Sequence, residues 1–167
     1  MKIQDLQFLY EYNYCARDQI LQNATKLTPE QFLEPKGYAH GSVRNTLVHI
    51  LSAEWVWRVR CQEHISPTSM FSVDEFYTLE KIQQRWLKEE EQMRGYLSQS
   101  EEPNLDQIVR YKRLNGETEE NILWHLLVHV VNHGTEHRSV LAAELTTYGF
   151  SPGDIDIVHF TRTIGHK

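Results

Sequence analysis

The sequence is poor in the features that define several common classes of protein. It has two cysteines, Cys15 and Cys61, which are far apart and form no Cys-x-x-Cys motif. Neither a disulfide framework nor a thiolate zinc site is therefore expected. No run of lysine and arginine is present, and the formal net charge is −6. An acidic chain without a basic patch is a poor partner for nucleic acid or for an anionic membrane surface.

Long apolar runs are also missing. The first residues, MKIQDLQF, contain no apolar signal core, and no window approaches the ~18 consecutive apolar residues that span a membrane. We therefore expect a cytoplasmic protein. Hydrophobic residues make up 40% of the 167 residues and charged residues 24%, a composition that is typical of globular proteins. Because the sequence contains no repeat, low-complexity tract or linker, residues 1–167 are predicted to form one domain.

Most long segments have the apolar spacing of amphipathic α-helices. Four long helices are predicted, over about residues 3–24, 42–60, 72–97 and 118–148. The second begins after the N-cap candidate Ser42, and the third begins at the capping-box pattern SVDE of residues 72–75. The fourth begins at Thr118, where Glu119 and Glu120 suit the first turn. A helix bundle is therefore the expected architecture.

Shorter elements are expected between and after the long helices. Thr28 and Pro29 suit the cap and the first position of a short helix, and the tail SPGDIDIVHFTR favours one helical turn. Residues 107–120, QIVRYKRLNGETEE, favour a β-hairpin, because Asn115-Gly116 suits a tight type I′ turn. The predicted fold class is all-α, a four-helix bundle with a short β-hairpin before the last long helix.

Four histidines recur at intervals of four in the last predicted long helix. Each step from His125 to His129, His133 and His137 over-rotates by about 40°, so only neighbours can share one metal ion. One helix therefore offers two ligands, such as His133 and His137, and a third ligand must come from another element. His49 is the candidate, because it lies midway along the second long helix among apolar residues.

Two imidazoles from one helix and one from another would form a three-nitrogen site with an open position. Such sites are typical of catalytic rather than structural zinc. Neutral ligands leave the full charge on the ion, which lowers the pKa of a bound water or thiol. Asn45, Glu54 or backbone carbonyls are candidate acceptors for the imidazole N–H groups.

Simple packing is the alternative interpretation, because a single buried histidine is usually a core residue with satisfied hydrogen bonds. The histidines outside the candidate site are interpreted as structural or solvent-facing: His40, His64, His125, His129, His159 and His166. A di-iron bundle is excluded, because it needs Glu-x-x-His pairs and the sequence contains none.

Three segments resemble, in order and spacing, the DinB family of small bacterial metal-binding proteins: YEYNYCARDQILQNATKLTPEQF, GSVRNTLVHILSAEWVWRVR and HVVNHGTEHRSVLAAELTTYGFSPGDIDIVHF. The resemblance covers nearly the whole chain, and the late NHxxxHR pattern is its sharpest part. It implies a four-helix bundle, usually a homodimer, in which His49, His133 and His137 hold a divalent metal. Ser139 and Val140 stand where the family often has Gly-Gln, so contacts there are expected to differ.

Relatives in the same superfamily include thiol-dependent transferases that use bacillithiol, mycothiol or glutathione. The resemblance therefore implies a metal-dependent transferase or hydrolase that acts on a small molecule. Zinc or nickel is the expected metal, and a low-molecular-weight thiol such as bacillithiol is a candidate cofactor. Glu54, as acid/base, and Arg138, as an anion contact, are the candidate catalytic residues. The expected partners are a small-molecule substrate and a second copy of the chain, with no nucleic acid and no membrane.

Two other functions remain open. The chain could be a non-catalytic stress protein, a dimer that its metal stabilises. The segment HGTEH, residues 133–137, also fits the H-x-x-E-H pattern of inverted zinc peptidases, with Glu136 as base. Against this, Glu136 lies about 100° around the helix from His137, so the motif alone does not direct it at a shared metal.

Overall fold

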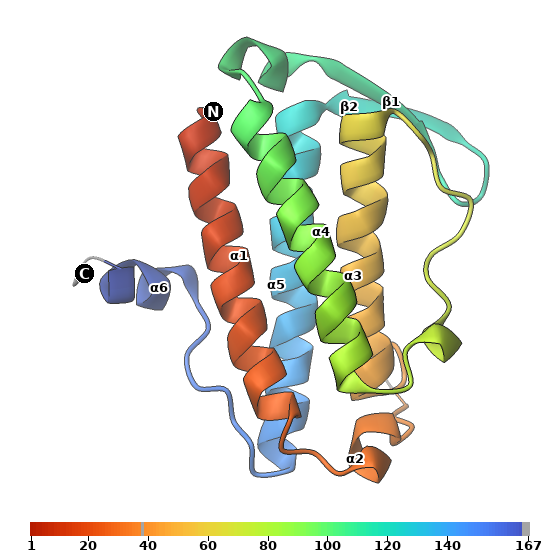
Figure 1. Cartoon of the computed structure of the whole chain (residues 1–167), viewed down its shortest axis with the longest axis vertical. Coiled ribbons are helices and arrows are strands. Elements are labelled where there is room, and N and C mark those ends of the chain that lie inside the picture. The colour runs from red at the N-terminus through yellow and green to blue at the C-terminus, as the bar shows by residue number, and fades with distance from the viewer. Residues whose placement is uncertain (38, 165–167) are drawn as a thin grey trace.

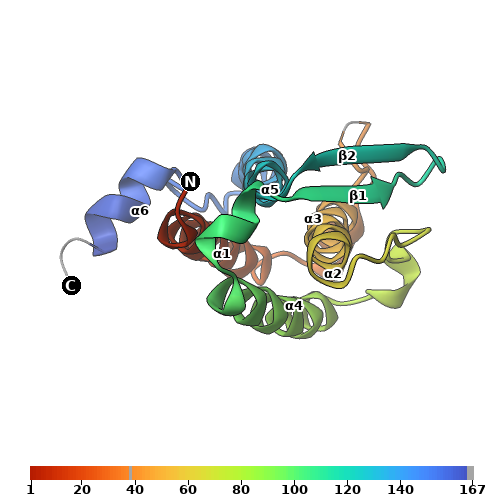
Figure 2. The same ribbon diagram turned by 90° about the horizontal axis from the view of Figure 1, so that it is seen from above.

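The computed structural model describes residues 1–37 and 39–164, and side chains as far as Arg162. Within these residues the chain forms six α-helices and one two-stranded antiparallel sheet, which confirms the predicted fold class. The four long helices lie side by side as a bundle (Figure 1): α1 Ile3–Ala24, α3 Val43–Arg58, α4 Leu79–Gln99 and α5 Leu123–Thr147. Viewed from above, α5 packs between α1 and α3, and α4 closes the opposite side (Figure 2).

Side-chain caps mark the starts of α2, Pro29–Leu33, and of α3. The helix α1 has the predicted bounds, and the short α2 begins after Thr28, whose side chain accepts a hydrogen bond from the Gln31 N–H. The Ser42 hydroxyl accepts a hydrogen bond from the Asn45 N–H and so caps α3, as predicted. The end of α3 continues into a π-helical turn, Val59–Glu63.

The third long helix begins later than the sequence indicated. Ser72 caps only a short 3₁₀ turn, Val73–Glu75, and α4 begins at Leu79 after a second cap, Thr78. Between them, Phe76 has a non-helical backbone (φ −121°, ψ 69°) and is buried. The predicted start near residue 72 is therefore wrong, because burial of the Phe76 ring interrupts the helix that the capping box favours locally.

The hairpin is longer than predicted and delays the last long helix. Strand β1, Ile108–Lys112, pairs antiparallel with β2, Thr118–Ile122. The predicted start of α5 at Thr118 is therefore wrong, because cross-strand hydrogen bonding takes these residues and α5 begins at Leu123. The type I′ turn is wrong too, since Gly116 has a positive φ of 89° and Asn115 does not.

The buried interior of the bundle is divided into two apolar clusters. The cluster nearer the hairpin includes Leu6, Tyr10, Met93, Leu97, Leu127 and Val130. The cluster at the other end includes Ile20, Leu47, Leu51, Trp86, Leu141 and Leu145. Between the two clusters along the helices lies a polar layer, which we define as Asn13, Arg17, Glu54 and Arg138, each no more than 3% exposed.

The tail returns along the outside of the bundle. After α5, residues 148–156 lead to α6, Ile157–Ile164, which confirms a helical segment in the predicted tail. Phe160 of α6 is buried against α1, where its ring lies 5.6 Å from that of Phe8. None of the helices described here has both the length and the apolar character that crossing a membrane requires.

Candidate metal centre

The structure brings the three predicted ligand histidines together. His49 lies on α3, and His133 and His137 lie one turn apart on the neighbouring α5. The Nε2 atoms of His49 and His133 are 3.0 Å apart. The ring centroid of His137 is 4.7 Å from that of His49 and 4.4 Å from that of His133. The imidazoles of two helices therefore converge, as the spacing predicted; their binding of a metal stays a prediction.

A fourth imidazole, that of His40, joins the cluster from the loop before α3. Its ring stacks on His49 with 3.7 Å between centroids and 21° between planes. One ring nitrogen from each of His40, His49 and His137 can be chosen so that all lie within 4.8 Å of one another, a grouping able to hold a metal ion. The sequence suggested a structural or solvent-facing role for His40, whereas the structure shows it at the site.

Local backbone geometry explains why His40 reaches the cluster. Its neighbours Ala39 and Gly41 both have positive φ, 51° and 92°, so the chain turns sharply on each side of it. The Asn45 side chain donates a hydrogen bond of 3.1 Å to the His40 carbonyl. Asn45 therefore holds the backbone of this loop. The sequence had suggested a different role for it, as an acceptor for an imidazole N–H group. Loop histidines have no periodic signal, so the sequence offered little to identify His40.

The imidazoles of the cluster are neutral at neutral pH. Burial, followed by repulsion from its histidine neighbours, lowers the pKa of His133 to about 3. The same causes lower the pKa of His49 to about 4, and burial also lowers the pKa values of His40 and His137. A neutral imidazole keeps a lone pair for a metal ion, so the cluster is in the protonation state that ligation requires.

The separation of the His49 and His133 nitrogens fits a divalent ion, whereas the grouping of nitrogens within 4.8 Å contains His40 in place of His133. Two imidazole nitrogens bound to one tetrahedral zinc at about 2.05 Å lie about 3.3 Å apart. The His49–His133 separation of 3.0 Å is a few tenths shorter, a difference that a small ring rotation removes. An all-imidazole donor set suits zinc, nickel or copper and is unlike the oxygen-rich sites of calcium and magnesium.

A cavity of about 170 Å³ adjoins two of these histidines. It is lined by His40 and His49 on one side, and by Phe71 and Met70, which precede the 3₁₀ turn, on another. The Trp55 and Phe71 rings stack nearby at 4.6 Å. The cavity therefore offers a small molecule a route to the imidazoles, with apolar walls beside them.

Comparison with known proteins agrees with this architecture and with the predicted resemblance. The model of the DinB family matches residues 2–165. The chain belongs to the DinB family. It is similar to Protein DinB of Bacillus subtilis (strain 168), with 25% identity over 154 residues that cover 89% of this chain and 88% of the relative.

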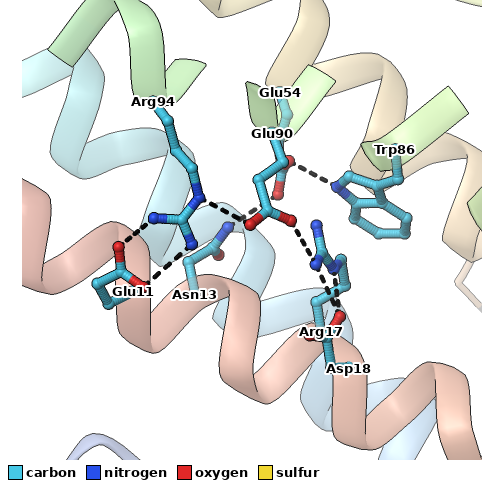
Figure 3. A network of polar contacts seen from close by, with 8 residues as sticks. All are labelled: Glu11, Asn13, Arg17, Asp18, Glu54, Trp86, Glu90 and Arg94. Atoms are coloured by element: carbon cyan, nitrogen blue, oxygen red, sulfur yellow. Dashed lines mark hydrogen bonds and ion pairs between the residues drawn. The ribbon is translucent and has the colours of Figure 1, made fainter. Parts of the chain in front are cut away.

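In this DinB family member, the two predicted catalytic residues lie in the polar layer of the bundle. The Glu54 carboxylate accepts hydrogen bonds from Asn13 Nδ2 at 2.9 Å and from Trp86 Nε1 at 2.7 Å (Figure 3). Arg138 Nη1 donates to Asn13 Oδ1 at 2.7 Å. Five residues separate His49 from Glu54, a rotation of about 140° that turns Glu54 away from the histidine face.

The layer is electrostatically balanced without the histidines. Burial raises the pKa of Glu54, and the hydrogen bonds from Asn13 and Trp86 oppose this rise. Burial lowers the pKa of Arg138, and the nearby Glu54 charge opposes that fall. Among the described residues, no hydrogen bond joins Glu54 or Arg138 to the histidine cluster. Their catalytic roles remain untested predictions, and the contacts favour a structural role.

The remaining members of the histidine stripe lie progressively further from the cluster. The His129 ring is 5.8 Å from His133 and 5.2 Å from Trp57. His125 packs edge-on against Trp124 at 4.0 Å and is exposed. Glu136, the candidate base of the peptidase interpretation, is also exposed. Along α5 the histidines therefore move from the exposed surface, at His125, to the site, at His133 and His137. The over-rotation at four-residue steps predicts this shift of face.

Proposed function

We propose that this protein binds one divalent metal ion, zinc or nickel, through His49, His133 and His137. The observation that carries the proposal is the meeting of neutral imidazoles from α3 and α5, with Nε2 atoms of His49 and His133 3.0 Å apart. Family membership supports it, because DinB proteins are often metal-binding. Three neutral ligands leave a coordination position open, as in catalytic sites.

His40 is assigned to the edge of the open position. Its near-parallel stacking on His49 holds the His49 ring from one side. The ring also lines the 170 Å³ cavity together with His49, so a molecule that enters there contacts both imidazoles. A loop residue can also move aside more easily than a residue in a packed helix. His40 therefore admits or orients the incoming molecule, and its loss weakens metal binding less than loss of His133.

We infer that the activity is that of a metal-dependent transferase or hydrolase acting on a small molecule in the cytoplasm. A divalent ion held by neutral imidazoles supplies Lewis acidity and makes a bound water or thiol more acidic. The protein's own groups position the ion, keep its ligands deprotonated and provide apolar walls beside it. A low-molecular-weight thiol such as bacillithiol is the proposed cofactor. The buried free thiol of Cys61 agrees with a reducing compartment.

Metal content of purified variants tests the ligand set. We expect about one ion per chain in the wild type, by mass spectrometry of the eluted metal. His49→Ala, His133→Ala and His137→Ala should each lose most of it, whereas His40→Ala should retain more. His125→Ala is the matched control, because it lies on the same helix and is exposed. If His133→Ala keeps full occupancy and His40→Ala loses it, the ligand set is His40, His49 and His137.

A thiol-transfer assay tests the activity. Metal-loaded protein is incubated with bacillithiol and an aryl halide electrophile, and release of halide is followed. We expect turnover in the wild type and none in His133→Ala above the uncatalysed rate. Absence of turnover in both, with full metal occupancy of the wild type, would contradict the transferase proposal while leaving the metal site intact.

A non-catalytic, metal-stabilised homodimer is the second candidate function. This alternative is favoured because both candidate catalytic residues, Glu54 and Arg138, form hydrogen bonds within the interior polar layer. Sedimentation of metal-loaded protein measures the dimer, and calorimetry with bacillithiol measures thiol binding. A dimer that binds no thiol supports this alternative, whereas heat of binding that depends on His133 supports the transferase.

A further inference from the structure

A second, larger cavity lies between the end of α3 and the β-hairpin. Its volume is about 530 Å³, and its lining includes Trp57, Arg60, Tyr111 and Glu119. Figure 1 shows the hairpin crossing the end of the bundle beside the last turn of α3. The walls therefore come from the end of α3 with its π-helical turn, which carry Trp57 and Arg60, and from the hairpin, which carries Tyr111 and Glu119. The proposed metal centre does not use any of these residues.

Arg60 is buried in the lining of this cavity without an acidic partner. It is 5% exposed, and its Nη2 donates a hydrogen bond of 2.8 Å to the Lys112 carbonyl. Its Nε is buried and has no hydrogen-bond partner among the described residues. Burial lowers the pKa of Arg60, and no carboxylate counters this effect. A buried cation without a counter-ion is costly, which makes the site a receptor for an anion.

Two other buried arginines, Arg58 and Arg17, have carboxylate partners. Arg58, two residues earlier, contacts Glu89 at 2.5 Å and Glu63 at 2.8 Å. Arg17 contacts Glu90 at 2.6 Å and Asp18 at 2.7 Å. Arg138 forms no ion pair among the described residues and instead donates hydrogen bonds to Asn13 and Thr135.

Arg60 differs from Arg58 and Arg17, because it has aromatic neighbours but no carboxylate partner among the described residues. Arg17 also lies over two aromatic rings, those of Tyr14 and Trp86, but its charge is paired. Because Arg60 lies beside a cavity, an anionic ligand has room to take the place of the missing counter-ion. A packed core would leave no such room.

Two aromatic rings orient the guanidinium. The Arg60 Cζ lies 4.7 Å from the centre of the Trp57 ring and 4.8 Å from that of Tyr111. These two rings pack edge to face at 5.0 Å. Cation–π contacts stabilise the guanidinium through its faces, so the in-plane N–H groups that do not bond the Lys112 carbonyl remain for a ligand. Planar N–H groups match the two oxygens of a carboxylate or phosphate group.

We propose that this cavity is a binding site for the oxyanion group, a carboxylate or a phosphate, of a small molecule, with Arg60 as its receptor. Trp57 and Tyr111 provide apolar contacts for the carbon skeleton. Glu119 lies on the lining and disfavours an anion, although Arg113, which it contacts at 4.0 Å, offsets part of its charge. The net preference for an anion therefore depends on Arg60.

Side chains of α3 and α5 connect the oxyanion site with the histidine cluster. Trp57 contacts His129, and His129 contacts His133, with 5.2 Å and 5.8 Å between ring centroids. Arg60 follows His49 by eleven residues, which corresponds to about 16 Å along a helix. An extended small molecule with an oxyanion at one end spans such a distance. This connection rests on the proposed function; the oxyanion site does not.

Calorimetric titration of metal-loaded protein with succinate and, separately, with inorganic phosphate tests the site. We expect at least one of them to bind, and binding to weaken about 10-fold or more in Arg60→Gln, because a charge-assisted hydrogen bond is lost. Arg110→Gln is the control, because it removes an exposed charge from β1, the strand that carries Tyr111. This variant should bind the probes as tightly as the wild type does. Preference for succinate identifies a carboxylate ligand, and preference for phosphate identifies a phosphoryl ligand. Binding of neither probe would overturn the proposal.

Two further variants separate this site from the metal and from folding defects. His133→Ala should lose metal and still bind the probe; if it binds none, the anion sits on the metal and the Arg60 site is refuted. Glu119→Gln should bind the probe several-fold more tightly than Glu120→Gln, an adjacent exposed residue with the same charge change. Equal affinities would overturn the proposal even if Arg60→Gln fails to fold.

Discussion

Gly134 lies between two of the proposed ligands on α5 and allows the polar layer to form. A Cβ at this position would lie 2.6 Å from Arg138 Nη1 and 2.9 Å from Asn13 Oδ1. Glycine in a helix interior costs about 1 kcal/mol relative to alanine. The hydrogen bond between Arg138 and Asn13, both buried, offsets that cost. Packing on the inner face of α5 thus constrains Gly134, while His133 and His137 occupy another face of the same turn.

Replacement of this glycine should destabilise the protein. We expect Gly134→Ala to lower the free energy of unfolding by about 1–3 kcal/mol, because Arg138 or Asn13 must move and leave a buried hydrogen bond unmade. Gly95→Ala in α4 is the control, since a Cβ at that position would meet nothing within 4 Å. That variant should be neutral or more stable by up to about 1 kcal/mol. Urea unfolding followed by circular dichroism measures both, and equal effects would contradict the steric argument.

At the scale of the elements, long-range contacts decided the boundaries that local patterns left ambiguous. The capping box at residues 72–75 forms only one 3₁₀ turn, because Phe76 is buried against the bundle. Residues 118–122 have acidic side chains that suit a helix start, yet they pair with β1. Tertiary contacts routinely override local helix preference in this way. The position of α2 and the start of α3 were predictable from caps that act within four residues, and the start of α1 was predictable from its apolar spacing.

The two caps before α4 should differ in importance. Thr78 accepts a hydrogen bond from the Lys81 N–H at the start of the long helix, so Thr78→Ala should cost about 1 kcal/mol. Ser72→Ala affects only the 3₁₀ turn and should cost less than half as much. Thermal and urea unfolding of the two variants provide the comparison. A larger effect at Ser72 would indicate that the helix begins there in solution.

On the scale of the whole molecule, polar residues cross the middle of the bundle between two apolar clusters. Glu54 and Arg138 of this layer connect α3 and α5 to α1 through Asn13. On other faces of the same two helices, the histidines connect α3 directly to α5. Glu90 of α4 further joins Arg17 and Arg94 (Figure 3). Metal binding would therefore add a link between helices that the interior already holds together.

Removal of the metal should lower stability without unfolding the bundle. An ion present at about 100 times its dissociation constant contributes about 2.7 kcal/mol. For a domain of this size we expect chelation to lower the melting temperature by about 5–10 °C. The melting temperature of His133→Ala should be insensitive to chelator, which provides the control. Calorimetric melting with and without chelator measures the difference, and an equal response of both proteins would contradict a histidine-held ion.

Local information in the sequence is enough to predict the helical periodicity, the local caps and the spacing of His133 and His137 on one helix face. These features depend on neighbours within a few residues, so a helix geometry of 3.6 residues per turn suffices to derive them. Long-range packing brings His40 to the cluster, turns Glu54 to the interior, and leaves Arg60 beside a cavity without a counter-ion among the described residues. These arrangements depend on which helix and loop surfaces meet, and such contacts join residues that are far apart in the chain.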